Sequence, residues 1–278
     1  MTTRFISLAF VLCCACIPGP GGRTDTPGDT LWHEIQEKRQ ITACYVDYPP
    51  SVITNLSDIS RPSGFLVEVT NEIARRAGLE VRYEPTTILE STAALGGRCN
   101  MVVAPVFITV ERAKKIDFTR PIVFWRGVAA LSRRADLEKF DSLDAVNKPG
   151  VRITVAAGTA QEEYVRRNLP RSERLTLTVE DISMTFLEVM AGRADVSFAS
   201  HFLISRFVAS QPEAAMLFGG KPLNDYAVAF PIPLGSVMSK AFLNNALLVL
   251  QTDGTMASLI RKYESEAQWS IQGQSHGG

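Results

Sequence analysis

Short apolar runs alternate with helical periods in the first half of the chain, and together they predict an α/β unit. Leu66, Val69 and Ile73 recur at spacings of three and four, which is typical of one buried helix face, and Gly78 stands where such a helix ends. Strand, helix, strand, helix, strand implies parallel pairing within a three-layer unit. The predicted elements are strands at 41–50, 79–85 and 100–105 and helices at 64–77 and 92–95.

The same order of elements restarts near residue 151 and predicts a second, smaller α/β unit. Thr159 followed by Glu162 forms a capping box, which marks a helix start directly after a strand. The two halves show no sequence repetition, so the shared order does not indicate a duplication. The predicted elements are strands at 151–157, 175–179, 194–200 and 225–232 and helices at 158–169, 183–192, 240–251 and 256–264.

Arg112 occupies an unusual place in this pattern. A helix is predicted to start near Thr109, which puts Arg112 in its first turn, where unpaired N–H groups already carry partial positive charge. A cation is locally unfavourable there, so Arg112 needs a partner elsewhere. In an open α/β sheet, ligands bind beyond the carboxyl ends of the strands, and both Arg112 and Thr159 lie just after such ends. If the two units face each other, these residues share one cleft.

The first 16 residues have the layout of a signal peptide. Arg4 precedes an apolar run that is too short to span a membrane, and a Pro/Gly-rich break follows. The cluster Cys13, Cys14 and Cys16 also resembles a lipoprotein processing site, with Cys16 after Ala15 preferred for lipidation and Cys14 or ordinary cleavage left open. Residues 17–30 are expected to form a flexible tether and residues 271–278 a disordered tail.

Composition narrows the classes of function. The chain is 46% hydrophobic and 21% charged with zero net charge, which describes a globular protein without the basic excess of a nucleic-acid binder. His33, His201 and His276 are far apart, so neither a metal nor a cofactor is predicted. Cys44 and Cys99 form either a disulfide or two buried thiols.

Six segments in order give the chain a resemblance to family 3 of the bacterial extracellular solute-binding proteins. The most specific are "ITVERAKKIDFTRP" (108–121), "AGTAQEEYV" (157–165) and "LQTDGTMASLIRKY" (250–263). The others are "VDYPP", "SGFLVEVTNEIARRAGLEV" and "AGRADVSF", and the likeness covers about residues 31–266. The middle section is also similar to cyclohexadienyl dehydratases, enzymes built on the same scaffold.

The resemblance implies an α/β fold of the type II periplasmic binding protein kind. Each lobe is then a mostly parallel sheet flanked by helices, and two hinge strands join the lobes. The first lobe is discontinuous, with residues 31–128 and 226–270, and the second comprises residues 129–225. Ligand is expected to bind between the lobes, whose closure buries it.

The family resemblance also implies that Arg112 grips the ligand's carboxylate, opposite the helix start at Thr159 and Ala160. A planar guanidinium suits two carboxylate oxygens. Three positions depart from the amino-acid pattern: Pro105 and Phe107 stand where small or hydroxyl residues are usual, and Ser200 replaces the acid that holds an ammonium. The ligand therefore either lacks an α-ammonium or relies on another acid, with Asp47 and Asp225 as candidates. The predicted ligand-binding residues are Arg112, Tyr48, Phe107, Thr159, Ala160, Ser200, His201 and Asp225.

Three functions from different classes follow. The first is a periplasmic or extracytoplasmic receptor, expected to be a monomer, that captures a small carboxylate compound and delivers it to a membrane permease of an ABC-type importer. The second is an accessory or sensor protein on the same fold. The third, a dehydratase-like enzyme, is disfavoured because Leu203 stands where the resembled enzymes have their glutamate general acid.

Overall fold

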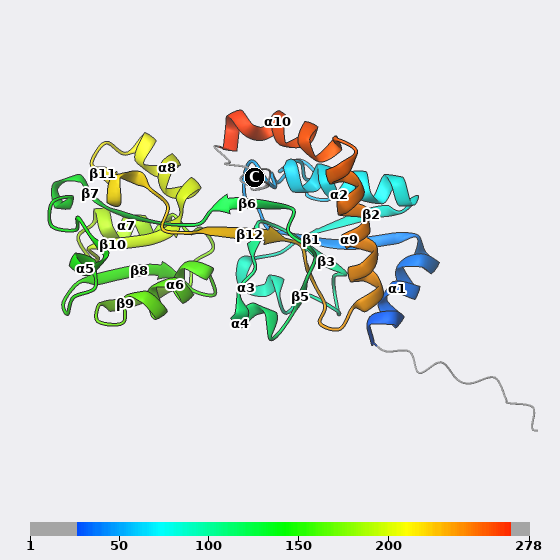
Figure 1. Cartoon of the computed structure of the whole chain (residues 1–278), viewed down its shortest axis with the longest axis horizontal. Coiled ribbons are helices and arrows are strands. Elements are labelled where there is room, and N and C mark those ends of the chain that lie inside the picture. Colours follow the sequence, from blue (N-terminus) through cyan, green and yellow to red (C-terminus); the bar gives the residue numbers. More distant parts are fainter. Residues whose placement is uncertain (1–26, 268–278) are drawn as a thin grey trace, which may run out of the picture.

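The computed structural model describes residues 27–267 and consists of two lobes placed side by side along the long axis (Figure 1). The first lobe is built around a parallel sheet in the order β2-β1-β3, in which Ile41 pairs with Val81 and Cys44 with Val102. These strands are β1 (Gln40–Tyr45), β2 (Glu80–Pro85) and β3 (Met101–Val103).

Two small antiparallel sheets complete the first lobe with strands from distant parts of the sequence. One has the order β4-β12-β6 and the other pairs β13 with β5. Because β12 and β13 come late in the chain, the lobe needs both ends of the sequence. The strands are β4 (Val106–Phe107), β5 (Asp117–Phe118), β6 (Val123–Arg126), β12 (Asp225–Ala229) and β13 (Pro231–Ile232).

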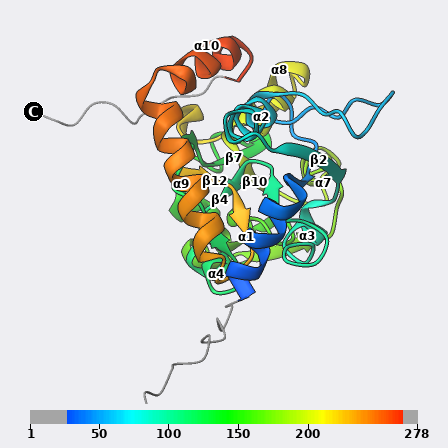
Figure 2. The ribbon, with the colours of Figure 1, turned by 90° about the vertical axis from the view of Figure 1, so that its right-hand side faces the viewer.

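Helices cover the first lobe, and its first helix packs on one of its last. Contacts join α1 to α9 and α2 to α10, and Figure 2 shows α1 and α9 alongside each other. Apolar positions of α2 such as Phe65 and Ile73 are buried in the core, and Gly78 ends the helix in the left-handed conformation at φ 63°. The helices are α1 (Pro27–Lys38), α2 (Phe65–Ala77), α3 (Ile88–Ser91), α4 (Val110–Ala113), α9 (Val237–Thr252) and α10 (Thr255–Ala267).

The second lobe has one five-stranded sheet in the order β11-β7-β10-β8-β9. β8 pairs in parallel with β9 and β10, whereas β7 pairs antiparallel with β10 and β11. The strands are β7 (Val128–Arg133), β8 (Arg152–Ala156), β9 (Glu173–Leu177), β10 (Val196–Ser200) and β11 (Ala214–Met216). The helices are α5 (Leu143–Val146), α6 (Ala160–Asn168), α7 (Met184–Met190), α8 (His201–Ser210) and the 3-10 turns η1 (Arg134–Asp136) and η2 (Phe218–Gly220).

Two chain segments cross between the lobes and lie close together. β6 runs into β7 through Gly127, whose N–H donates to the Asn224 carbonyl at 2.8 Å, and Val128 N–H donates to Asn224 Oδ1 at 2.9 Å. A Cβ at residue 127 would lie 2.5 Å from Asn224 Oδ1 and 2.7 Å from the Tyr226 ring. Only glycine allows this approach of the two crossing segments.

A disulfide joins Cys44 of β1 to Cys99, which precedes β3, with Cα atoms 5.7 Å apart. Both residues are buried in a small apolar cluster with Val46 and Val102. The alternative of two free thiols is therefore not what the structure shows. The crosslink closes a segment of 55 residues that contains α2, β2 and α3.

Most predicted elements are confirmed, with two corrections. The short helix expected at 92–95 lies instead at Ile88–Ser91, because the Thr87 hydroxyl accepts a hydrogen bond from Glu90 N–H and starts the helix earlier. The last four residues of the predicted tether, 27–30, form the first turn of α1.

The remaining terminal predictions are not tested by the described structure. The signal peptide, Cys16, the tether up to residue 26 and the tail at 271–278 lie outside the described residues. The lobe boundaries after residues 128 and 225 fall at the two crossing segments and stay a prediction.

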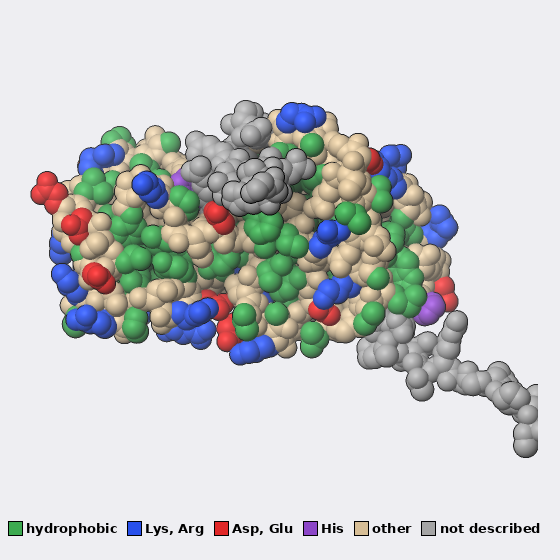
Figure 3. Space-filling model, in the orientation of Figure 1, with side chains coloured by type: hydrophobic (Ala, Val, Ile, Leu, Met, Phe, Trp, Pro, Cys, Tyr) green, Lys and Arg blue, Asp and Glu red, His purple; other side chains and the backbone are tan. Residues whose placement is uncertain are grey.

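The surface charges and the hydropathy of the helices bear on the predicted classes of function. On the face in Figure 3, side chains of both signs are interspersed without a continuous patch of either. Within residues 27–267, no helix is both long and apolar enough to cross a membrane.

Candidate functional site

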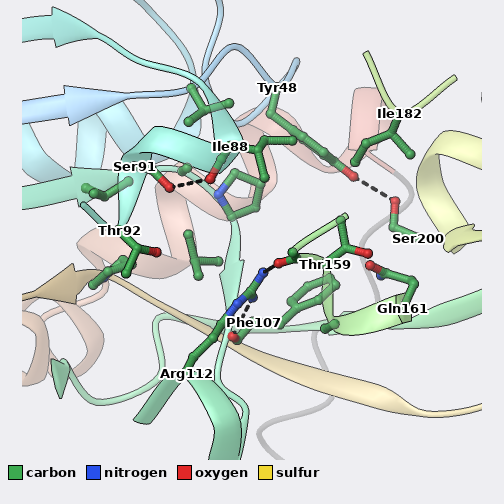
Figure 4. Close-up of a pocket in the computed structure, with 18 residues that line it drawn as sticks. Tyr48, Ile88, Ser91, Thr92, Phe107, Arg112, Thr159, Gln161, Ile182 and Ser200 are labelled. Carbon is green, nitrogen blue, oxygen red and sulfur yellow. Dashed lines mark hydrogen bonds between the residues drawn. The ribbon is translucent and has the colours of Figure 1, made fainter. Parts of the chain in front are cut away.

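A cavity of about 100 Å³ lies between the lobes (Figure 4). Its walls come from the loops that follow β1, β3 and β8 and from the end of β10, so the carboxyl ends of the strands of both lobes face it. The lining residues are Val46, Tyr48, Ile88, Ser91, Thr92, Val102, Ala104, Pro105, Val106, Phe107, Arg112, Gly158, Thr159, Ala160, Gln161, Ile182, Ser200 and Pro231.

Arg112 reaches this cavity from the short helix α4. The Thr109 hydroxyl caps that helix by accepting a hydrogen bond from Arg112 N–H at 3.2 Å. The guanidinium donates to the carbonyl of Phe107 at 2.9 Å and, across the lobes, to that of Gly158 at 2.8 Å. Burial lowers the pKa of Arg112, although an arginine remains charged in proteins. Within residues 27–267, it has no ion-pair partner within salt-bridge distance.

The facing wall is the start of α6. The Thr159 hydroxyl accepts a hydrogen bond from Glu162 N–H at 3.2 Å, and Glu162 Oε2 accepts one from Gly158 N–H at 2.8 Å. In the predicted capping box, the glutamate side chain accepts from the N–H of the capping Thr159. Here Glu162 accepts instead from the N–H of Gly158, one residue earlier. The first turn of a helix has unpaired backbone N–H groups, which stabilise an anion. The α6 start therefore presents donors opposite Arg112.

A second contact between the lobes joins Tyr48 to Ser200. Their hydroxyl oxygens are 2.7 Å apart, and Ser200 also caps α8 by accepting from Leu203 N–H. Burial raises the pKa of Tyr48 to about 12, so its phenol is neutral at physiological pH. Together with the Arg112–Gly158 bond, this contact joins the two lobes across the cavity.

Aromatic rings support the first-lobe side of the cavity. Phe107 stacks on Tyr226 with ring centroids 4.7 Å apart and meets Trp125 edge-on at 6.3 Å. Tyr48 lies 5.9 Å from the Trp125 ring. Phe107 therefore serves both as core packing and as an apolar wall.

The structure brings most of the predicted site residues together. Those that line the cavity are Tyr48, Phe107, Arg112, Thr159, Ala160 and Ser200. His201 does not line it, because its ring lies between the Gly220 carbonyl (Nε2 to O, 3.0 Å) and the Ser205 hydroxyl. Asp225 is exposed at the start of β12, and Asp47 is exposed and accepts a hydrogen bond from Thr54 N–H.

Sequence reasoning missed Gln161, which also faces the cavity. It is the second residue of α6, and its side chain is only 6% exposed. The available signal was its position two residues after the capping Thr159, in the turn that points at the cleft. Ser91, the last residue of α3, and Thr92, which follows it, were missed because this helix was placed at 92–95.

Comparisons with known proteins agree with this geometry. The family described as bacterial extracellular solute-binding proteins, family 3, matches residues 41–266. The L-cystine-binding protein TcyJ of Escherichia coli K12 is 25% identical over 217 residues, covering 78% of this chain and 79% of that protein. A probable histidine-binding protein of Campylobacter jejuni is 26% identical over 76% of this chain and 80% of its own length.

Solved structures show the same fold. The crystal structure of the ancestral amino acid-binding protein AncCDT-1, a precursor of cyclohexadienyl dehydratase, superposes with a TM-score of 0.71 at 26% identity, covering 84% of this chain and 98% of that one. AbpA of Streptococcus pneumoniae, bound to L-arginine, superposes at 0.70 with 19% identity, covering 87% and 100%, and supports the fold alone. The fold is thus that of type II periplasmic binding proteins, and the chain belongs to family 3 of the bacterial extracellular solute-binding proteins.

Proposed function

We propose that this protein captures a small carboxylate-bearing metabolite, an amino acid or an amine-free organic acid, and delivers it to an ABC-type importer. The observation that carries the proposal is a cavity between the two lobes in which Arg112 is the one formally charged side chain among the described lining residues. Relatives named for binding cystine and histidine support a solute-binding role. One relative of Bacillus subtilis is named as a probable ABC transporter extracellular-binding protein.

The binding step follows from the groups at the cavity. Arg112 presents a planar fork of donors whose present acceptors are two backbone carbonyls. A carboxylate is a stronger acceptor than a carbonyl, and the α6 start adds N–H donors from the other lobe. A bound carboxylate is thus stabilised by both lobes at once, which favours the closed arrangement over an open one.

Closure requires a hinge, and the two crossing segments at Gly127 and Asn224 are its proposed site. They are connected by hydrogen bonds of 2.8 and 2.9 Å from the N–H groups of Gly127 and Val128 to Asn224. Rotation about such a pair of segments separates the Tyr48–Ser200 and Arg112–Gly158 contacts and opens the cavity to solvent.

We further propose that the protein is not an enzyme. Among the described lining residues, the titratable side chains are Arg112 and Tyr48, and neither transfers protons readily near neutral pH. Leu203, where the resembled dehydratases have their acid, lines a separate pocket beside Tyr48. Incubation with prephenate should give no dehydration product; turnover that survives purification would overturn this part of the proposal.

Export and anchoring complete the proposal. The family is extracellular, and the apolar N-terminus with its cysteine cluster is consistent with a lipoprotein whose Cys16 is acylated. Expression of the full chain with a labelled fatty acid should label the wild type and not the Cys16→Ala variant. We expect a monomer bound to the membrane by this anchor alone.

The central experiment measures ligand binding by the purified protein with and without Arg112. Titration calorimetry against small amino acids and amine-free acids should identify a ligand, which at 100 times its Kd adds about 2.7 kcal/mol to the free energy of unfolding. The Arg112→Ala change should cost about 2–5 kcal/mol of binding free energy, because it removes one partner of a desolvated charge pair.

Arg171→Ala is the matched control, because Arg171 is exposed and lies outside the cavity, so its loss should leave Kd unchanged. Arg112→Lys retains the positive charge without the planar guanidinium, so its ligand affinity should lie between those of Arg112→Ala and Arg171→Ala. If no small carboxylate binds the wild type, the receptor proposal fails and the accessory-protein alternative is favoured.

A further inference from the structure

The charges around the cavity do not balance for a zwitterion. Arg112 contributes one positive charge, and no aspartate or glutamate is among the described lining residues. A ligand with a single negative charge would make the closed cavity neutral. An amino acid brings an ammonium as well, and that group would be desolvated beside a guanidinium without a carboxylate to pair with it, which is strongly unfavourable.

Nearby acids lie on other surfaces. Glu163 acts on Arg112 electrostatically, but it lines a separate groove together with Glu111 and Arg166 and not the cavity. Asp47, Glu180 and Asp181 are exposed and line the pocket on the other side of Tyr48. In the closed arrangement none of them faces the central cavity.

The cavity does contain an unused neutral polar group. Gln161 is only 6% exposed, and its side-chain amide makes no hydrogen bond to another residue within the described range 27–267. Its amide end points into the cavity in Figure 4, near Thr159 and Ser200. The amide is open to the cavity and has no partner there among the described residues, so it is available to hydrogen-bond a ligand. An amide donates to a hydroxyl or carbonyl oxygen and also accepts from a hydroxyl.

We propose that the cavity selects an amine-free carboxylate that carries a neutral oxygen, such as a hydroxy or keto acid, with Gln161 as a specificity-determining residue. This rests on the proposed function. Arg112 binds the carboxylate, and Gln161 binds the neutral oxygen. The Tyr48–Ser200 hydroxyl pair, 2.7 Å apart, supplies further neutral contacts on the same side.

The size of the cavity limits the ligand. A water molecule needs roughly 10–15 Å³ of such space, so a cavity of about 100 Å³ has room for about seven to ten water-sized groups. For an acid with three oxygens, that number of non-hydrogen atoms corresponds to about four to seven carbons. Larger acids would require the cavity to open.

The test compares acids that differ only at the second carbon. Calorimetry on the purified full protein would use lactate, alanine and propionate, and the larger set 2-hydroxyisovalerate, valine and isovalerate. We expect that, of the two hydroxy acids, the one with the higher affinity binds at least tenfold tighter than the amino acid of the same set. Gln161→Ala should weaken the hydroxy acid about tenfold and leave the unsubstituted acid nearly unchanged, whereas Gln211→Ala, an exposed glutamine after α8, should change neither.

A second variant tests the proposal through a gained preference for amino acids instead of a loss of affinity. Ser200→Asp introduces an acid into the cavity wall, and aspartate can still cap α8 as serine does. This variant should reverse the preference toward the amino acid by tenfold or more. Gln161→Glu provides a second acid at the cavity if the first variant does not fold.

The outcomes separate this inference from the proposed function. If the wild type binds an amino acid tighter than its hydroxy counterpart, and Arg112→Ala abolishes that binding, the receptor function is supported and this inference is overturned. Equal loss of hydroxy and unsubstituted acids in Gln161→Ala would also overturn the role of Gln161. If none of the acids binds, the proposed function itself fails.

Discussion

The two lobes contribute chemically different walls to one cavity. The first lobe supplies the charge, Arg112, together with the rings of Phe107 and Tyr48, whereas the second supplies neutral groups from Thr159 to Gln161 and Ser200. The difference separates two requirements of recognition. In the proposed binding mode, the first lobe holds the carboxylate in either arrangement, and the neighbouring substituent contacts the second lobe only after closure.

The lobes also differ in how they are built. The first has three small sheets with strands from both ends of the chain and is crosslinked by Cys44–Cys99. The second has one five-stranded sheet from a continuous stretch of sequence and contains no cysteine. We expect the first lobe to depend on its crosslink and the second to rely on its sheet and apolar core.

Removing the disulfide should have the largest effect on stability. The double change Cys44→Ala and Cys99→Ala should lower the free energy of unfolding by about 2–4 kcal/mol, as is typical when a long closed segment is released. Urea titration measures the loss, and hydrogen exchange should place it in β1 and β3 rather than in β8 and β10. Equal loss of protection in both lobes would contradict the contrast drawn between them.

Disturbing the crossing segments should have the next largest effect. A Cβ at residue 127 would lie 2.8 Å from the Asn224 carbonyl oxygen, so Gly127→Ala forces backbone to move and should cost about 1–3 kcal/mol. Thermal unfolding measures the cost, and small-angle scattering should show a changed lobe separation.

The matched control is Gly97→Ala, since nothing lies within 4 Å of a Cβ built there. We expect a change of at most about 0.5 kcal/mol for this exposed position. If both variants behave alike, the close approach at Gly127 does not limit how the lobes are joined.

An acid-sensitive contact of the first lobe should give the smallest effect. The Arg76 guanidinium forms ion pairs with Glu72 and Asp253 and so joins α2 to the end of α9. Its hydrogen bond lowers the pKa of Asp253 to about 2. Arg75 and Arg76 together lower the pKa of Glu72 to about 2. Depressed carboxyl pKa values contribute stability above about pH 4 that is lost as the pH falls toward 2. Arg76→Gln should therefore flatten the fall in stability between about pH 4 and pH 2.

Screening limits this contribution, because the Arg76 side chain is one-third exposed. Arg167→Gln on α6 is the control. The Arg167–Glu163 ion pair is 4.0 Å long and the arginine side chain is 71% exposed, so this change should leave the dependence of stability on acid pH unchanged. A profile that is identical in wild type and Arg76→Gln would show that the contact does not stabilise the lobe at any pH.

The sequence predicted the elements well because each carries local signals. The α2 helix has an apolar stripe and a glycine end, and α6 has its capping threonine. α3 was placed four residues late because Thr87 was not recognised as its cap. Local patterns do not specify which strands from opposite ends of the chain pair. The family resemblance predicted only that the first lobe combines both ends of the chain, and the β4-β12-β6 sheet was not predicted.

The site was predictable to the extent that it depends on chain position. Arg112 and Thr159 follow strand ends, and that is enough to place them at a cleft. Side-chain direction decided the remainder: His201 directly follows Ser200 yet turns toward Gly220, whereas Gln161 turns inward. Such directions are set by tertiary packing, which residue types alone do not reveal.

The split construction of the first lobe has a consequence for biogenesis. A chain made from its N-terminus presents every strand of the second-lobe sheet before β12, β13, α9 and α10 exist. The second lobe can therefore fold while synthesis continues, but β4, β5 and β6 must wait for their partners. The lobe that carries Arg112 is completed last, so in a nascent chain the wall proposed to select the ligand can fold before the wall that contains Arg112.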